Sequence, residues 1–257
     1  MPLLKAANWF SHLEYDLISP VWRHWWLELS RRYQLIRYDE RGCGLSDWDV
    51  DEFSIEAWVN DLECVADAAG PEKFALLGIS QGAAVAVTYA VRHPERVSHL
   101  IIYGGCAQGM KKRARTPAHL EQVLVLRDLL RVGWGQDLPA FRKIFASLFA
   151  PEATREQVEA FDALQRVSTS PQNAVRFFDA FSEFDVVELA SEVRVPTLVL
   201  HSRHDMMVPM AQGRLFASSI PGAKLVSLES SNHILAETET PWQNFLDEVD
   251  RFLGQET

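Results

Sequence analysis

The sequence predicts an α/β fold in which a mostly parallel sheet is covered by helices on both faces. The first observation is that short apolar segments typical of strands alternate with segments of helical periodicity, over residues 3–103 and again over residues 197–252. The second is that residues 73–79 (KFALLGI) are almost continuously apolar, as a parallel strand buried on both faces should be. Strands connected through helices run parallel, because each helix returns the chain to the end of the sheet at which it started.

The individual elements follow from local signals. In the first part of the chain we expect strands over residues 3–7, 33–38, 73–79 and 97–103, and helices over residues 54–69 and 81–92. The first helix places Ile55 and Trp58 on one face and ends at Gly70-Pro71, and the second consists of small residues and stops before Pro94. In the last part the same reasoning predicts strands over residues 197–201 and 224–228, and helices over residues 210–220 and 242–252.

The alternation is interrupted between residues 106 and 193, where helical segments rich in phenylalanine dominate. We expect helices there over residues 119–132, 138–149, 154–166 and 171–182. We therefore predict two structural units. Residues 1–105 and 194–257 form the α/β core, and residues 106–193 form an inserted helical cap.

Composition disfavours several classes of protein. The 257 residues include 35 acidic and 25 basic side chains, and the resulting net charge of −10 argues against a nucleic-acid partner. The basic run over residues 111–115 (KKRAR) is therefore interpreted as a solvated face of the insert. No run approaches the ~18 apolar residues that cross a bilayer, and the N-terminal residues lack a secretory pattern. Cys43, Cys64 and Cys106 are too few for a disulfide framework, so we expect a cytoplasmic protein without membrane contact.

The strongest chemical signal is Gly78-Ile79-Ser80-Gln81-Gly82, which lies between a buried strand and a helix of small residues. This is the context of the nucleophile elbow, a sharp turn that lifts a serine hydroxyl above the sheet. The helix that follows contributes free N–H groups close to the position where an oxyanion would develop. We therefore predict that Ser80 is a nucleophile.

A serine hydroxyl needs a base, and the base needs an acid that orients it. Enzymes with this elbow place the acid and then the histidine after the serine along the chain. Of the eight histidines, only His233 follows the last predicted strand, and Asp205 follows the strand over residues 197–201. We predict Ser80, Asp205 and His233 as a catalytic triad. The oxyanion hole would consist of the backbone N–H groups of Gln81 and of Trp9, in the loop after the first strand.

Two further patterns are weaker. His201-x-x-His204-Asp205 resembles part of a metal site, but no second cluster completes four ligands, so we expect no metal. Gly42-Cys43-Gly44 follows a strand, but position 47 is aspartate where a dinucleotide-binding fingerprint requires glycine, so we expect no nucleotide cofactor.

Several motifs besides the elbow point to one family. They are residues 38–47 (YDERGCGLSD), 92–97 (RHPERV), 195–201 (VPTLVLH), the Asp205-x-x-Val-Pro209 turn and Asn232-His233. With residues 78–82, they make nearly the whole chain similar to the α/β-hydrolase family. This resemblance implies the α/β-hydrolase fold and a serine esterase that requires no cofactor. The segments SHLEYD and SPVWRHW also resemble a bacterial subgroup often attached to adenylate-cyclase or LuxR-type regulatory domains.

The chain departs from the family at two places. Members usually have His-Gly before the oxyanion residue, whereas this chain has Ala7-Asn8 before Trp9. The family's first two antiparallel strands also have no counterpart here, so the strand over residues 33–38 becomes an edge of the sheet. Such an edge must be covered, which predicts a homodimer.

These observations predict a carboxylesterase-like hydrolase whose small-molecule ester substrate is cleaved through an acyl-enzyme on Ser80. The aromatic residues predict an apolar substrate pocket, and its expected members are Phe10, Trp134, Phe141, Phe145 and Phe181. The alternative is that these aromatic residues only pack the core of the insert.

Two other functions stay open. A lactonase or a carbon–carbon bond hydrolase would keep the same triad, whereas epoxide hydrolases and dehalogenases normally use an aspartate nucleophile where this chain has Ser80. The resemblance to the regulator-associated subgroup also leaves open a small-molecule receptor that retains a triad.

Overall fold

The computed structural model describes residues 1–136 and 139–254. Its centre is a sheet of six strands in the order β2-β1-β3-β4-β5-β6. Within the described ranges every neighbouring pair of these strands is parallel. The strands are β1 (Pro2–Ala6), β2 (Gln34–Ile36), β3 (Phe74–Ile79), β4 (Val97–Tyr103), β5 (Thr197–Ser202) and β6 (Lys224–Leu228).

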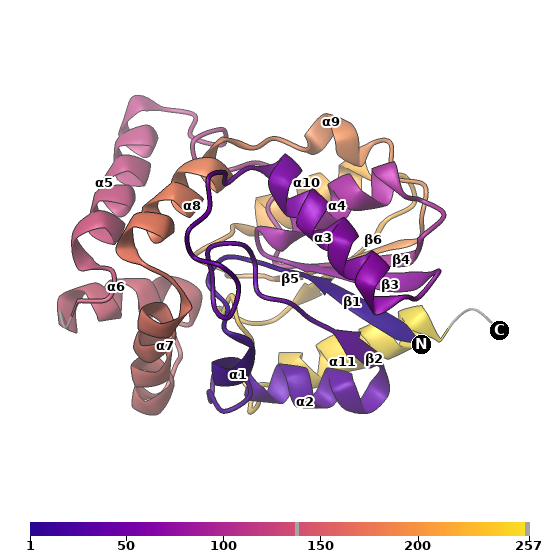
Figure 1. Ribbon diagram of the computed structural model, residues 1–257, viewed down its shortest axis with the longest axis horizontal. Helices are drawn as coiled ribbons and strands as arrows, with labels where there is room; N and C mark the ends of the chain where they lie inside the picture. The colour runs from indigo at the N-terminus through magenta and orange to yellow at the C-terminus, as the bar shows by residue number, and fades with distance from the viewer. Residues whose placement is uncertain (137–138, 255–257) are drawn as a thin grey trace.

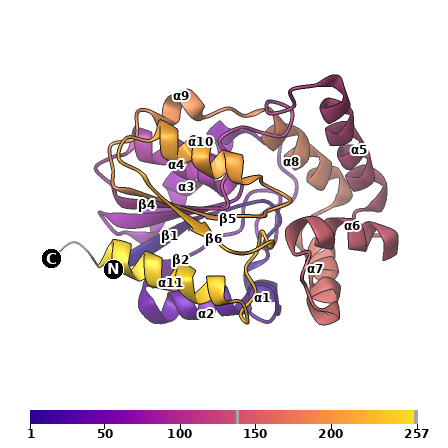
Figure 2. The ribbon, with the colours of Figure 1, turned by 180° about the vertical axis from the view of Figure 1, so that it is seen from behind.

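Helices cover both faces of this sheet, as the sequence predicts (Figures 1 and 2). One face carries α3 (Ile55–Ala69), α4 (Gly82–Arg92), α9 (Val187–Ala190) and α10 (Met210–Ser219). The other face carries α2 (Arg23–Arg32) and α11 (Thr240–Leu253), with the short α1 (Leu13–Asp16) beside α2. Among the described residues, no helix has the length and apolar composition needed to cross a membrane.

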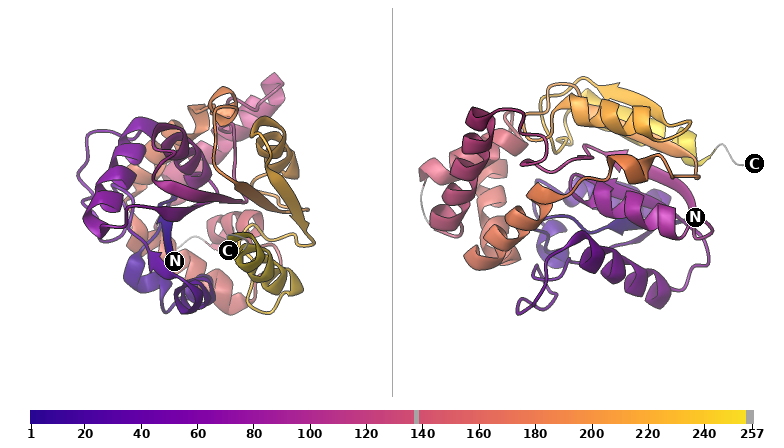
Figure 3. Two further views of the ribbon diagram at one scale, coloured as in Figure 1. Left: turned by 90° about the vertical axis from the view of Figure 1, so that its right-hand side faces the viewer. Right: turned by 90° about the horizontal axis from the view of Figure 1, so that it is seen from above.

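Four helices between β4 and β5 lie together beside the sheet, at the end where the strands finish (Figures 1 and 3). They are α5 (Pro117–Gly133), α6 (Pro139–Phe149), α7 (Arg155–Ser168) and α8 (Pro171–Glu183). Leu138, included in the helix predicted over residues 138–149, lies outside the described residues. The role of these helices as a cap over the site stays a prediction.

Local signals set the ends of several helices. The Ser54 hydroxyl accepts a hydrogen bond from the Ala57 N–H at 3.1 Å and begins α3. Gly70 ends the same helix in the left-handed conformation, with φ of 83°. Thr154 and Gln157 form a reciprocal capping box at the start of α7.

The predicted strands are all present, and most ends agree to within one or two residues. The strand expected over residues 33–38 is shorter, because only Gln34–Ile36 pairs with β1. It lies at the edge of the sheet as expected, and the homodimer that would cover this edge stays a prediction. Helices α1, α2 and α9 were not predicted. Two of them have four residues each, and Trp22 at the start of α2 provides no side-chain cap.

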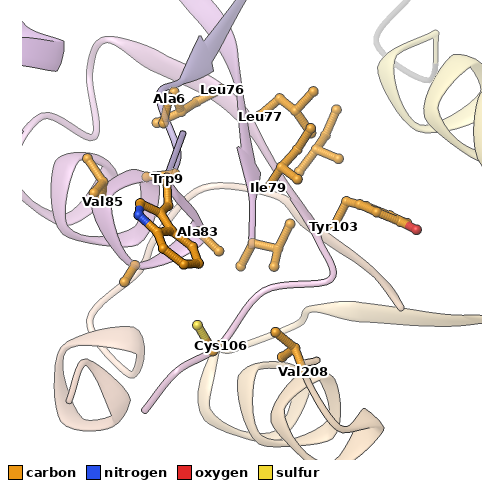
Figure 4. Packing of buried hydrophobic residues seen from close by; sticks show 14 of the residues in the cluster. Ala6, Trp9, Leu76, Leu77, Ile79, Ala83, Val85, Tyr103, Cys106 and Val208 are labelled. Carbon is orange, nitrogen blue, oxygen red and sulfur yellow. The ribbon is translucent and has the colours of Figure 1, made fainter. Parts of the chain in front are cut away.

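The apolar core extends from the sheet to the end where β3 finishes (Figure 4). Every residue of β3 is buried. The core there includes Trp9, Ile79, Cys106 and Val208, which also line a cavity. The fold therefore places one wall of a cavity at the carboxyl end of the central strands, where ligands bind in open α/β sheets.

Candidate active site

Ser80 occupies a strained turn between β3 and α4. Its φ is 54°, in the left-handed region that non-glycine residues rarely adopt. Glycines are required on both sides of it. A Cβ at Gly78 would lie 2.6 Å from the Cα of Ala83, and a Cβ at Gly82 would lie 2.6 Å from the carbonyl oxygen of Ala7. The close packing of β1, β3 and α4 thus explains why the motif has glycine at both positions.

Asp205 and His233 meet across the end of the sheet. The Nδ1 atom of His233 lies 2.6 Å from the Oδ2 atom of Asp205, and the two residues are 2% and 6% exposed. The other carboxylate oxygen, Oδ1, accepts hydrogen bonds from the N–H groups of Met207 at 2.9 Å and Val208 at 2.8 Å. The carboxylate is therefore fixed in one orientation, with one oxygen directed at the imidazole.

The loop that carries His233 is held by the end of α6. The N–H groups of His233 and Ile234 donate to the carbonyl oxygen of Phe149 at 2.8 and 3.2 Å. The Phe149 ring also packs edge-on against the imidazole, with centroids 5.6 Å apart. The Asn232 amide oxygen accepts from the Glu152 N–H at 3.1 Å. Residues between β4 and β5 thus fix the position of the histidine.

Ser80 and His233 line the same cavity. The Nε2 atom of His233 is buried, and it has no hydrogen-bond partner in the part of the chain that the structure describes. This nitrogen is the atom that would accept a proton from Ser80. Hydrogen bonds between a nucleophile and its base are often long in enzymes without substrate and shorten when substrate binds.

A second histidine adjoins this group. The Nε2 atom of His201 lies 2.7 Å from the carbonyl oxygen of Val208 and 3.8 Å from the Oδ2 atom of Asp205. Burial lowers the pKa of His201 below its ordinary value, which favours a neutral imidazole beside the carboxylate. Among the described residues, no group of three His, Cys, Asp or Glu side chains is placed to hold a metal ion.

The predicted oxyanion hole differs from expectation in one respect. The N–H of Trp9 is not free, because it donates to the side-chain oxygen Oε1 of Gln81 at 3.2 Å. The backbone N–H of Gln81 lies at the N-terminus of α4, where such groups have no partner within the helix. Phe10 follows with φ of 38°, so the loop that carries Trp9 is strained. Both residues predicted to supply the donors therefore line the cavity, and the N–H of Trp9 is already hydrogen-bonded to the amide oxygen of Gln81.

The amide of Gln81 is connected to a buried acid. Its Nε2 atom donates to the Oε1 atom of Glu40 at 3.3 Å. Glu40 is 1% exposed, and its Oε2 atom has no partner among the described residues. Burial raises the pKa of Glu40 to about 8. A protonated Glu40 therefore stands behind the predicted oxyanion site at neutral pH.

The cavity beside Ser80 has about 630 Å³ of empty space, part of it open to solvent. Two predicted pocket residues, Phe10 and Phe181, line it. The prediction was wrong for Trp134, Phe141 and Phe145, which are buried but are not among the lining side chains. Trp134 stacks on Trp9 with centroids 5.6 Å apart, and Phe145 packs edge-on against both Trp9 and Trp134. These three rings support the wall of the cavity instead of forming it.

Sequence reasoning missed other lining residues, among them Trp22, Met110, Arg113, Phe149 and Met207. The interpretation of residues 111–115 as a solvated face is wrong for Arg113, whose side chain lines the cavity. Cys106 also lines it, but burial raises the pKa of its thiol to about 11, so the reactive thiolate is disfavoured.

Comparison with known proteins agrees with this architecture. A family model for the alpha/beta hydrolase fold matches residues 17–240. A protein named putative carbamate hydrolase RutD from Azorhizobium caulinodans is 28% identical over 221 residues, which cover 82% of this chain and 78% of that protein.

Solved structures give the same result. A hydrolase from Pseudomonas aeruginosa is 25% identical, with a TM-score of 0.79 over 98% of this chain and 89% of that one. An esterase from Exiguobacterium antarcticum superimposes with a TM-score of 0.81 at 22% identity, covering 99% of this chain and 92% of that chain. An enol-lactonase from Burkholderia xenovorans has a TM-score of 0.77 at 22% identity, covering 99% and 91%.

Proposed function

Because this chain belongs to the α/β-hydrolase family, we propose that it is a serine hydrolase that cleaves carboxylic esters through an acyl-enzyme on Ser80. The observation that carries the proposal is the 2.6 Å hydrogen bond between Asp205 and His233, beside a cavity that Ser80 also lines. A carboxylate fixed against Nδ1 directs the free lone pair of the imidazole to Nε2, which is the arrangement that a general base requires.

The reaction would proceed in two acyl transfers. Ser80 Oγ attacks the acyl carbon while His233 Nε2 takes its proton, and the same nitrogen then gives that proton to the leaving alcohol. Asp205 stabilises the imidazolium that forms between these steps. A water molecule, deprotonated by His233, then attacks the acyl-enzyme. The bond between the acyl carbon and Ser80 Oγ breaks, His233 returns the proton to Ser80 Oγ, and the acid is released.

The oxyanion formed in each step needs donors that are in place beforehand. The backbone N–H of Gln81 is one, and the N–H of Trp9 becomes the other when the Gln81 side-chain oxygen moves away from it. The substrate carbonyl oxygen would thus replace Gln81 Oε1 as the acceptor of the Trp9 N–H.

The names of similar proteins keep two related substrates open. Carbamate and lactone hydrolysis also begin with attack on a carbonyl carbon and would use the same three residues. An ester is proposed because the cavity is lined mainly by apolar and aromatic side chains, which fit an acyl or aryl group of small to medium size.

The test is hydrolysis of 4-nitrophenyl esters of increasing chain length by the wild-type protein, by Ser80→Ala and by Ser227→Ala. Ser227 is exposed on β6 and serves as the matched control. We expect Ser80→Ala to lose on the order of 10⁶ in kcat, the usual effect of removing such a nucleophile. Labelling by a fluorophosphonate should disappear in Ser80→Ala alone. Equal, near-background rates for all three proteins would contradict the proposal and favour a receptor function.

A further inference from the structure

The cavity beside Ser80 contains one cationic side chain. Arg113 is the only lysine or arginine among the described residues that line it, and none of those residues is an aspartate or glutamate. The Nη2 atom of Arg113 donates to the carbonyl oxygen of Met207 at 3.1 Å. Within the described ranges no carboxylate lies at ion-pair distance from its guanidinium. Asp205 acts on Arg113 only from beyond ion-pair distance. A partly buried cation without a carboxylate in direct contact is costly, so its presence in a cavity favours the binding of an anion there.

Two nearby cations, Lys111 of the same basic run and Arg127 of α5, are paired with carboxylates. Lys111 lies 3.0 Å from Glu183 and 3.7 Å from Asp179, and Arg127 binds Asp179 at 2.6 Å. In a protein of net charge −10, acidic partners for arginine are abundant. Among the described residues Lys112 and Arg115 also have no ion pair, but both are exposed, so Arg113 is distinguished by lacking a carboxylate partner while it is partly buried.

A second, wider groove continues from the cavity at Arg113. The two share Gln108, Met110, Arg113 and Met207, and the groove has about 1170 Å³ of empty space, part of it open solvent. Arg115 and His119 line its outer part, and no aspartate or glutamate is among its described lining residues. Clefts lined by charge of one sign raise the local concentration of ligands of the opposite sign. The groove and the adjoining cavity that Ser80 lines thus favour anions although the protein as a whole is acidic.

We infer that Arg113 binds the carboxylate of a monoanionic substrate whose ester or lactone carbonyl lies at Ser80. This inference rests on the proposed function and names its substrate class. The planar guanidinium fork matches a carboxylate in two hydrogen bonds. A single cation balances a single negative charge, whereas a phosphate dianion would leave a second charge unbalanced, since no other lysine or arginine is among the described lining residues. The apolar side chains between Arg113 and Ser80 would contact the carbon chain that joins the carboxylate to the reacting carbonyl.

The test compares pairs of substrates of similar shape that differ in charge. Mono-4-nitrophenyl glutarate and 4-nitrophenyl pentanoate differ at the end of the acyl chain, and 4-acetoxybenzoate and 4-methylphenyl acetate differ on the alcohol part. The readout is the ratio of kcat/KM for the anionic ester to that for the neutral one. The proteins are wild type, Arg113→Gln, Arg113→Lys and, as a matched loss of charge, Lys112→Gln, whose residue is exposed in the same basic run.

We expect Arg113→Gln to lower this ratio by about 10- to 100-fold for at least one pair, which is the usual contribution of hydrogen bonds to a charged group. Arg113→Lys should restore part of it, and Lys112→Gln should leave it within about twofold, since its exposed charge is screened. A ratio that Arg113→Gln leaves unchanged for both pairs overturns the inference.

A binding measurement separates this inference from the proposed function. Titration of Ser80→Ala with mono-4-nitrophenyl glutarate, followed by calorimetry, reports on the anion site without turnover. If the wild-type protein hydrolyses no ester but Ser80→Ala binds this monoester and the double variant with Arg113→Gln does not, the anion site stands and only the hydrolytic role fails. If both bind it equally, the anion site fails.

Discussion

The substitution Asp205→Asn tests the orientation of the predicted base directly. In the wild-type protein the Asp205 Oδ1 atom is held by the N–H groups of Met207 and Val208 at 2.9 and 2.8 Å. An asparagine would keep its carbonyl oxygen at this position, because its NH₂ group cannot face two donors. Its NH₂ group would then replace Oδ2 and face the Nδ1 atom of His233, 2.6 Å away in the wild type.

The tautomer of His233 would consequently be reversed. An NH₂ group can only donate, so Nδ1 becomes an acceptor and the proton moves to Nε2. An imidazole protonated at Nε2 cannot take the proton of Ser80. We expect kcat to fall on the order of 10⁴-fold, the effect of this change in other serine triads. At about 1.4 kcal/mol per factor of ten, this corresponds to about 5.5 kcal/mol of transition-state stabilisation.

The assay is kcat/KM for a 4-nitrophenyl ester, together with the rate of fluorophosphonate labelling and the ¹⁵N chemical shifts of the histidine rings. Glu229→Gln is the matched control, since Glu229 lies 3.2 Å from the exposed His204, in a carboxylate–histidine contact whose two residues do not line the cavity. It should leave kcat/KM within about twofold, as exposed pairs contribute little. An Asp205→Asn protein that keeps its fold and more than a tenth of the wild-type activity would refute the tautomer argument.

Three further changes have defined outcomes. At Gly104 φ is +54°, and a Cβ would lie 3.0 Å from the Cε1 atom of His233. For Gly104→Ala we therefore expect a lower Tm and at least a tenfold loss of kcat/KM, because a shift of the imidazole that raises the activation free energy by about 1.4 kcal/mol is enough for that loss. Glu40 has its pKa raised to about 8, so the folded state retains a proton that the unfolded chain loses, and stability should fall as pH rises from about 4.5 to about 8. Glu40→Gln should remove the contribution of this group to the pH dependence of the free energy of unfolding, which is at most about 1.4 kcal/mol per pH unit. Urea unfolding across that pH range measures it. Phe145→Ala should lower the free energy of unfolding by about 3–5 kcal/mol, while KM of the folded protein changes less than twofold, since the ring is fully buried and does not line the cavity.

Much of the fold was predictable because the parallel strands appear in the sequence as short apolar runs. The bounds of β4 and β6 agree with prediction to the residue, and those of β3 to within one residue. Strands β3 and β4 are buried almost throughout and therefore appear in the sequence as nearly continuous apolar runs. Helix α2 was missed because the burial of its apolar face depends on distant elements. The ring of Trp25 packs against Tyr103 of β4 and Trp242 of α11, with centroids 4.9 and 4.8 Å apart. Such tertiary partners leave no local signal.

The positions of site residues that follow from the order of the strands along the chain were predictable, whereas those that depend on how the helices pack were not. Strand ends bring Asp205 and His233 together, as their positions after successive strands indicate. Periodicity shows which face of a helix is apolar, but not which element covers it, so Phe141 and Phe145 were assigned to the pocket although they lie behind it. The place of Arg113 in the cavity could not be predicted for the same reason. Its charge in the sequence is the same as that of the paired Lys111.

The contact between Trp9 and Gln81 lies beyond any sequence signal, because a backbone donor meets a side chain 72 positions away. Its length of 3.2 Å exceeds the usual 2.9–3.0 Å for such bonds, so it is a weak one. An oxyanion binds the same N–H more strongly than a neutral amide does, whereas a ground-state carbonyl gains little by displacing that amide. In the proposed mechanism this exchange would favour the transition state over bound substrate, which is the condition for raising kcat. Glu40 accepts a hydrogen bond from the Nε2 atom of the same amide at 3.3 Å, so movement of the Gln81 amide would alter this contact as well.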